Sequence, residues 1–290
     1  MKKIYSTLLL AFVLGGFSTP LLAQPEGWTT SFPAFRIIGP LYDVGTLDLS
    51  VFLITTDQGH ILINTGIETS TAQIRENMAS LGFRLEDVRI LLTQQAHYDH
   101  TGALADIKEI SGAQMWATAK DARVLEDGGF SDAHFGGEES FKPVRVDRIL
   151  QEGDIVELGD VQLKVHEHPG HTEGSSSYTF VVNENGRDYR VAILNMGTIN
   201  PGKRLVDDPT YPGVAADFAY TYASQKAMEV DVWVAAHKGQ YNMHDKYQPG
   251  QPYDPNTFVD PYGLLRELND LESAFLEQLA EEQRNTSYPD

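Results

Sequence analysis

The amino-acid sequence predicts an α/β fold, a four-layer αββα sandwich in which helices cover two β-sheets from outside. Strand-like segments rich in Val, Ile, Leu and aromatic residues alternate with helix-like segments in both halves of the 290-residue chain. The sequence contains neither an internal repeat at solenoid spacing nor a low-complexity linker. We therefore expect a single layered domain over residues 24–290.

Turn residues and helix caps mark the expected elements. The Asp-Gln-Gly sequence at 57–59 is typical of a tight turn between two strands within residues 50–66. A Thr-Ser pair at 69–70 is suited to cap a helix that ends near Gly82. The other expected elements are bounded similarly: strands within 88–93, 154–170, 175–182, 187–195 and 230–237, and helices at 103–112, 119–128, 217–229 and from 261 to about 283.

The loop 127–140 differs from its neighbours because it is polar and glycine-rich, with two separate aromatic residues, Phe130 and Phe135. A mobile surface loop and a plain connector are both compatible with this composition. The sequence leaves the role of this loop open.

The N-terminus has the three parts of a secretory signal peptide. Lys2 and Lys3 precede an apolar run at 8–17 and a small-residue end at Ala23, after which we expect cleavage. A membrane anchor is the alternative, although the apolar run is short for a bilayer. The two-lysine start is typical of bacteria and predicts a periplasmic protein. Because the chain has no cysteine, disulfides cannot stabilise it after export.

Acidic residues dominate the charge. The formal net charge is −19, and without the two lysines of the signal it becomes −21, with 20 basic against 41 acidic residues. Such a surface repels nucleic acid and anionic membranes. We expect no nucleic-acid partner, no membrane association after signal cleavage, and a charge that serves solubility.

Four of the nine histidines directly follow expected strands, where functional groups collect in layered α/β folds. These are His97, His100, His171 and His237. Neutral imidazole and carboxylate are good zinc ligands, so these strand ends predict a metal site. The other histidines, His60, His134, His166, His168 and His244, are expected to be surface or structural residues, and His168 is a candidate for orienting a ligand.

The stretch LLTQQAHYDHTG carries most of this chemistry. Gln95 and His97 point alike if the backbone is still extended, whereas Asp99 and His100 fall in the turn and can serve a second metal position. An ordinary helix N-cap at Asp99 is the alternative. Only the facing of the strand decides whether Gln95 or Gln94 meets the metal.

Three motifs in order, QAHYDHTGAL, HPGHTEGSSSY and VAAH, resemble the metallo-β-lactamase superfamily, whose first motif is usually His-x-His-x-Asp-His. The glutamine at the first motif position is similar to the GOB-type enzymes of the third subclass of class B β-lactamases. The resemblance implies the metallo-β-lactamase fold and up to two Zn2+ ions. It assigns Gln95, His97 and His171 to the first zinc and Asp99, His100 and His237 to the second.

The resemblance implies zinc-dependent hydrolysis of the β-lactam amide bond of penicillins, cephalosporins and carbapenems. Because enzymes of this subclass are mostly monomers, it also implies a monomer. Its catalytic residues would be Asp99, His97 and His100, and Thr198 is a weak candidate for binding the substrate carboxylate, with a strand-end residue of no role as the alternative. Because an amide oxygen is a weaker donor than imidazole, the first site should bind zinc less tightly than the second.

Residues and motifs that the sequence lacks limit the reactions it can be expected to catalyse. Many hydrolases of the superfamily place a metal-bridging aspartate where this chain has AILNMGTIN, which argues against thioesterases and lactonases. Ser-x-x-Lys, Lys-Thr-Gly and Gly-x-Ser-x-Gly motifs are also missing, so the sequence gives no support to serine β-lactamase chemistry. Two alternatives to a β-lactamase remain. One is another metallohydrolase on the same fold that acts on a lactone, a thioester or another amide, and the other is a metal-binding protein without catalysis.

Overall fold

The structure, a computed structural model, describes residues 24–287. The expected signal peptide, residues 1–23, lies outside the described residues. Within the described part, none of the helices has both the length and the apolar character needed to cross a membrane.

The first sheet contains seven strands among the described residues, in the order of the sequence. They are β1 (Phe35–Ile38), β2 (Leu41–Asp43), β3 (Phe52–Thr56), β4 (Gly59–Ile63), β5 (Val88–Leu92), β6 (Gln114–Thr118) and β7 (Arg148–Leu150). Pairing is antiparallel from β1 to β4 and parallel from β4 to β7. The parallel part brings the carboxyl ends of β4, β5 and β6 to one edge, where the polar segment after β5 begins.

The second sheet has five strands in the order β12-β11-β10-β9-β8 within residues 24–287. They are β8 (Ile155–Leu158), β9 (Val161–Glu167), β10 (Ser176–Glu184), β11 (Arg187–Leu194) and β12 (Val232–Ala235). Only the β11–β12 pair is parallel among these, so both strands end on the same side. Buried and exposed residues alternate along β9, which fits a sheet with one face in the core and one toward solvent.

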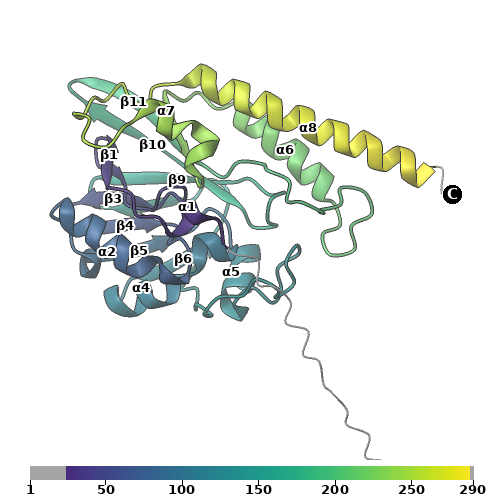
Figure 1. Cartoon of the computed structure of the whole chain (residues 1–290), viewed down its shortest axis with the longest axis horizontal. Coiled ribbons are helices and arrows are strands. Elements are labelled where there is room, and N and C mark those ends of the chain that lie inside the picture. The colour runs from purple at the N-terminus through teal and green to yellow at the C-terminus, as the bar shows by residue number, and fades with distance from the viewer. Residues whose placement is uncertain (1–23, 288–290) are drawn as a thin grey trace, which may run out of the picture.

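Helices cover both sheets from outside. The α-helices are α1 (Glu26–Thr29), α2 (Thr71–Ser80), α3 (Tyr98–Thr101), α4 (Leu104–Ser111), α5 (Ala119–Asp127), α6 (Val214–Lys226), α7 (Met243–Lys246) and α8 (Pro261–Ser287). Short 3-10 turns η1 (Glu68–Ser70), η2 (Leu85–Asp87) and η3 (Lys238–Tyr241) join them. Figure 1 shows α2, α4 and α5 below the first sheet and α6 and α8 above the second. The four-layer prediction is therefore confirmed.

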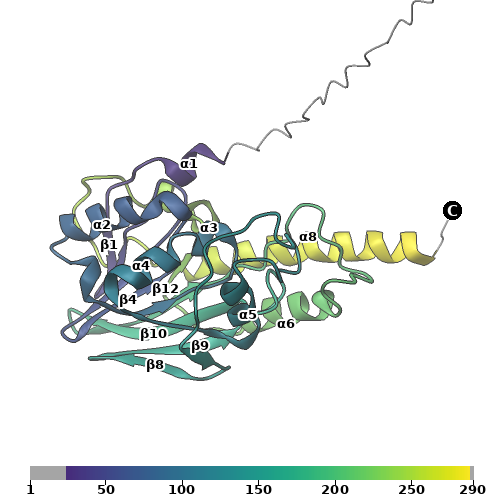
Figure 2. The same ribbon diagram turned by 90° about the horizontal axis from the view of Figure 1, so that it is seen from below.

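The core lies in two parts. The larger lies between the sheets and under α6 and α8, and it includes the fully buried Tyr178 and Trp233. The smaller lies between the first sheet and the helices α2 and α4, and it includes Leu62, Met78 and Leu104. Figure 2, from below, shows β8, β9 and β10 along one side of the molecule.

Sequence reasoning located the long elements and missed the shortest. The helix expected over 68–83 is η1 followed by α2, and the closing helix from 261 extends to Ser287. The sequence reasoning did not predict β1, β2, β6 and β7, which have three to five residues each. A four-residue strand carries too little hydrophobic periodicity to be distinguished from a connector.

Candidate metal centre

Strand β5 leads directly into the polar segment at the sheet edge. Helix α3 begins at Tyr98, with His97 as its N-cap residue, so Asp99 and His100 lie in a helical turn. The helix expected from Ala103 is α4, with Ala103 as its N-cap residue, and α3 is a separate single turn before it that the sequence did not predict. Asp99 is inside α3 and is not its cap, which removes the ordinary N-cap interpretation.

The residues that follow β4 form backbone hydrogen bonds with helix α3 and the residue after it. The backbone N–H of Thr65 donates to the carbonyl of His100 at 2.7 Å, and the N–H of Gly102 donates to Gly66 at 2.9 Å. A Cβ at position 102 would lie 2.4 Å from the backbone nitrogen of Glu68. The close approach requires glycine in the motif HTG and fixes the position of α3.

The two neighbouring glutamines have different surroundings. The side chain of Gln94 is fully buried, and its Oε1 accepts a hydrogen bond from Asn64 Nδ2 at 2.8 Å. Gln95 lines a cavity with the candidate histidines, and its buried Oε1 lacks a hydrogen-bond partner. Gln95, and not Gln94, therefore has an oxygen available for a metal.

The candidate ligands of the second zinc form a tight cluster. Asp99 Oδ2 lies 3.1 Å from His100 Nε2 and 3.3 Å from His237 Nε2. The ligand atoms of these three side chains lie within 4.8 Å of one another. In residues 24–287, no other group of three His, Cys, Asp or Glu side chains brings its ligand atoms this close together. His237 reaches the cluster from the end of β12.

The candidate ligands of the first zinc lie beside this cluster. The rings of His97 and His171 are 4.8 Å apart between centroids. His171 Nδ1 lies 2.7 Å from the backbone oxygen of Thr198, which leaves Nε2 of this ring for a metal. The structure thus places Thr198 behind a candidate ligand as well as in the cavity wall.

Two carboxylates outside these sets contact candidate ligands. Asp48 Oδ2 lies 3.5 Å from His237 Nδ1 and accepts a hydrogen bond from Trp28 Nε1 at 2.9 Å. Asp132 Oδ2 lies 3.4 Å from His97 Nε2. Sequence reasoning identified none of these contacts, because both aspartates lie far from the histidine motifs in the chain.

The candidate ligands open into a small cavity of about 210 Å³. Aromatic and amide side chains complete its wall, and the lining residues are Trp28, Gln95, His97, Tyr98, Asp99, Phe135, His171, Thr198, Asn200, His237 and Gln240. Phe135 belongs to the loop that the sequence left without a role. This loop is therefore part of the cavity wall.

The pKa of a histidine differs between the candidate ligands of the first zinc and those of the second. Burial lowers the pKa of His171 to about 3, so its ring is neutral at physiological pH, as a metal ligand must be. Burial also opposes charge on His237, but the carboxylates of Asp48 and Asp99 outweigh it and raise its pKa to about 9. A metal that binds His237 must displace this proton.

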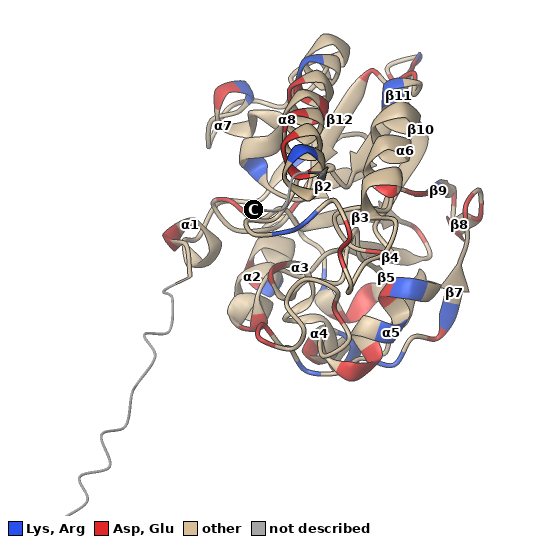
Figure 3. Ribbon diagram, turned by 90° about the vertical axis from the view of Figure 1, so that its right-hand side faces the viewer, with Lys and Arg blue, Asp and Glu red and all other residues tan. Residues whose placement is uncertain are grey.

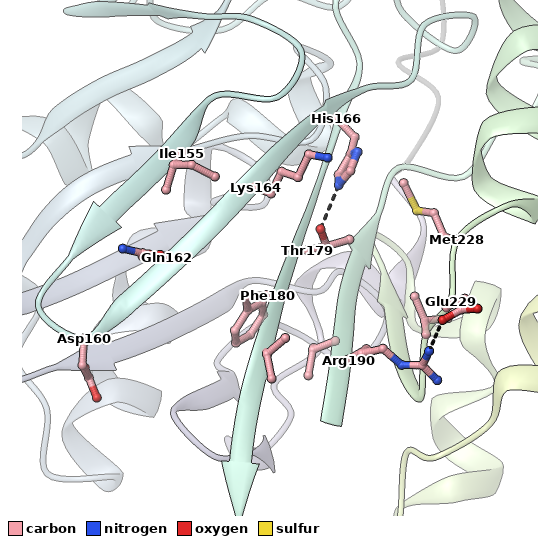
Figure 4. Close-up of a pocket in the computed structure, with 13 residues that line it drawn as sticks. Ile155, Asp160, Gln162, Lys164, His166, Thr179, Phe180, Arg190, Met228 and Glu229 are labelled. Atoms are coloured by element: carbon pink, nitrogen blue, oxygen red, sulfur yellow. Dashed lines mark hydrogen bonds and ion pairs between the residues drawn. The ribbon is translucent and has the colours of Figure 1, made fainter. Parts of the chain in front are cut away.

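Three of the remaining histidines, His60, His166 and His168, lie away from this cavity, whereas the ring of His134 lies 4.6 Å from that of Phe135 in the cavity wall. His168 is fully buried and contacts Ser177, Ser224 and Gln225, none of which is a candidate ligand. His166 lines a second cavity of about 540 Å³ on the outer face of the second sheet, where its Nε2 lies 2.8 Å from Thr179 Oγ1 (Figure 4). This cavity shares no lining residue with the first. His60 packs against Phe83 in the first sheet.

Known proteins resemble this chain in sequence and in fold. The family model of the metallo-β-lactamase superfamily matches residues 44–184. The crystal structure of the metallo-β-lactamase GOB-18 from Elizabethkingia meningoseptica is 42% identical, with a TM-score of 0.87 over 89% of this chain and 96% of that one. The chain belongs to the metallo-β-lactamase superfamily. The class B3 di-zinc enzyme LRA-12 from an Alaskan soil metagenome is 45% identical, with a TM-score of 0.86 over 89% and 98% of the two chains.

Curated relatives of this superfamily member are more distant. A hydroxyacylglutathione hydrolase of Rhodospirillum rubrum is 28% identical over 145 residues, which cover 47% of this chain and 48% of the relative. The acyl-coenzyme A thioesterase MBLAC2 of Gallus gallus is 27% identical over 156 residues, 49% and 51% of the two. The chain thus spans about half the length of the curated relatives it matches.

The predicted resemblance to the third subclass and to the GOB-type enzymes is confirmed by the solved structures.

The residues present fit a metal of this superfamily. Gln95 Oε1, His97 Nε2 and the ring nitrogens of His100 are buried without a hydrogen-bond partner in residues 24–287, so each of these three side chains has an atom left for an ion. Nitrogen and carboxylate donors in a cluster of this size suit zinc. At the position of the bridging aspartate of related hydrolases, the chain has the buried Asn195 and Met196.

Proposed function

We propose that this chain is a metallo-β-lactamase of the third subclass that hydrolyses the amide bond of penicillins, cephalosporins and carbapenems. The observation that carries the proposal is that one cavity is lined by Gln95, His97 and His171 together with Asp99 and His237, and that the buried His100 completes the cluster of three around Asp99. The 42% identity to GOB-18 over 96% of that enzyme supports the substrate class.

The chain's own residues would divide the work of hydrolysis. Bound zinc would lower the pKa of a water molecule and polarise the substrate carbonyl. Asp99, placed between His100 and His237, would orient the attacking oxygen, and His97 and His100 would hold their ligand positions. Thr198 Oγ1 would donate to the substrate carboxylate from the cavity wall. Trp28 and Phe135 would exclude bulk water from the reacting bond.

We also propose two zinc ions per chain at most, with the Gln95 site the weaker. A neutral amide oxygen replaces an imidazole there, whereas the second set is intact. Burial opposes ionisation of Asp99, but His100 and His237 hold its pKa well below the usual range, so this ligand is anionic. Anionic charge at the second site favours a divalent cation.

The protein is proposed to act in the periplasm as a monomer. Residues 1–23 would be cleaved, leaving residues 24–290 as one domain. The acidic surface, with Asp and Glu on α1, α4, α5 and α8 in Figure 3, argues against nucleic acid as a partner.

Turnover of nitrocefin and imipenem tests the proposal. We expect EDTA to abolish turnover and zinc to restore it. The second candidate is a thioesterase or lactonase on the same fold, which the likeness to hydroxyacylglutathione hydrolases favours. Zinc-dependent hydrolysis of thioesters or lactones, without any hydrolysis of β-lactams, would establish that candidate and overturn the proposed β-lactamase function.

A further inference from the structure

Asp132 is a buried carboxylate with two different partners. Its Oδ1 accepts the backbone N–H of His134 at 2.9 Å and of Phe135 at 2.6 Å. Its Oδ2 faces His97 Nε2 at 3.4 Å, and the side chain is only 5% exposed. One oxygen therefore fixes the loop 127–140, and the other contacts a candidate zinc ligand.

His97 Nε2 is buried and has no hydrogen-bond partner of good geometry within the described residues, and Asp132 Oδ2 is the carboxylate oxygen beside it at 3.4 Å. A small rotation of the ring would make this contact a hydrogen bond and leave Nδ1 for a metal. A metal-bound histidine commonly donates its second N–H to a carboxylate, which fixes the ring's orientation and makes it a stronger donor. Asp132 has the burial and the position for this role at the site that contains Gln95.

Residues on either side of Asp132 in its loop contact other parts of the chain. The ring of Phe135 lies edge-on to His97, 4.8 Å between centroids. On the other side, Thr210 Oγ1 donates to the carbonyl of Ala133 at 2.7 Å. Asp132 is thus held by its own loop against His97.

We propose that Asp132 is a positioning residue for the first zinc site, which holds His97 with Nδ1 toward the metal and thereby offsets the weak donor Gln95. This inference rests on the two-zinc function proposed above. Because the same carboxylate caps the backbone at His134 and Phe135, zinc binding at the first site and the order of the cavity-lining loop are coupled. The coupling is reciprocal, as for any linked equilibria.

The experiment measures the stepwise zinc affinities of the mature chain by competition with a chelator of known affinity. Asp132→Asn keeps the shape of the side chain and removes its charge. It is compared with Glu138→Gln, the same change at an exposed position of the same loop. Both changes are also made in a Gln95→His background, where tighter binding keeps the first affinity measurable. A second readout is hydrogen exchange of the amides of His134 and Phe135 as zinc is added.

We expect Asp132→Asn to weaken the first site by about 10- to 100-fold and to leave the second site unchanged. The protection that zinc gives to the amides of His134 and Phe135 should shrink in the same variant, and Glu138→Gln should behave as wild type. Equal weakening of both sites would show a general structural role and overturn the inference. Unchanged affinities in both backgrounds would also overturn it. Absence of zinc binding in every variant would instead refute the proposed function.

Discussion

Asn64 holds Gln94 through hydrogen bonds to its side chain and its backbone. Asn64 Nδ2 donates to Gln94 Oε1 at 2.8 Å, and the backbone N–H of Gln94 donates to Asn64 Oδ1 at 3.0 Å. Asn64 itself has a positive φ of 64°, a conformation that asparagine tolerates better than most residues. This pair keeps Gln94 in the core and leaves Gln95 to face the cavity.

The first prediction separates the two glutamines. Gln95→His should tighten zinc binding at the first site, because imidazole is a stronger zinc donor than an amide oxygen. Gln94→His should give no such gain, because position 94 is turned into the core. Zinc content after dialysis at low zinc measures both. Equal, tight binding of two zinc ions by wild type and Gln95→His would contradict the prediction.

Loss of a ligand from the second set should have a larger effect. His237→Gln removes one of the three clustered ligands, so kcat/KM for imipenem should fall by at least about 100-fold. The matched control is His244→Gln, since His244 lies seven residues further along and bonds to the carbonyl of Leu47. A similar loss in both variants would indicate damage to the fold.

Two atoms of Thr198 lie near His171 Nδ1, the backbone oxygen at 2.7 Å and the hydroxyl Oγ1 at 3.1 Å. Because Thr198→Val keeps the shorter contact, which the backbone oxygen makes, it should retain zinc. Loss of a hydrogen bond to a carboxylate should raise KM about 10-fold or more, and Thr198→Ser should retain the wild-type KM. An unchanged KM in Thr198→Val would leave Thr198 as a strand-end residue without a role in substrate binding.

A buried ion pair beside His237 predicts a stability effect. Lys238 Nζ lies 3.2 Å from Asp43 Oδ1, and neither side chain is exposed. Lys238→Met should lower the free energy of unfolding by about 3–5 kcal/mol, because it leaves a buried carboxylate without its partner. Adding Asp43→Asn should recover part of this loss in urea unfolding. A double variant less stable than the single one would argue against the pair.

His168 predicts a pH dependence of stability. Burial, with a smaller contribution from His166, lowers its pKa to about 3. Between pH 6.5 and 3 the unfolded chain therefore binds a proton that the folded chain does not, so stability falls as pH falls, by up to about 1.4 kcal/mol per pH unit. The stability advantage of wild type over His168→Gln should shrink from pH 8 to pH 5 in EDTA. A constant difference would contradict this.

The sequence was informative where the chemistry is local. Gln95, His97, Asp99 and His100 lie within six residues, and His171 and His237 each follow a strand that the hydrophobic pattern revealed. The layered fold followed from the same alternation. Short strands such as β2 and β7 could not be recognised, because three residues show no period.

Contacts between distant parts of the chain were beyond sequence reasoning. Asp48 and Asp132 carry no motif, and only folding brings their carboxylates to His237 and His97. The role of the loop 127–140 stayed open at the sequence level because its contact through Asp132 is with His97, more than thirty positions away. Gln94 and Gln95 could be separated only by the buried partner Asn64.

The most direct test of the proposed function measures zinc content and imipenem turnover in the same samples. EDTA-treated wild type and Gln95→His are reloaded with increasing zinc. We predict that turnover returns with bound zinc in both proteins, and that wild type fills the Asp99, His100 and His237 site before the Gln95 site. Stable zinc at that cluster, without hydrolysis of imipenem or any other β-lactam, would contradict the proposal.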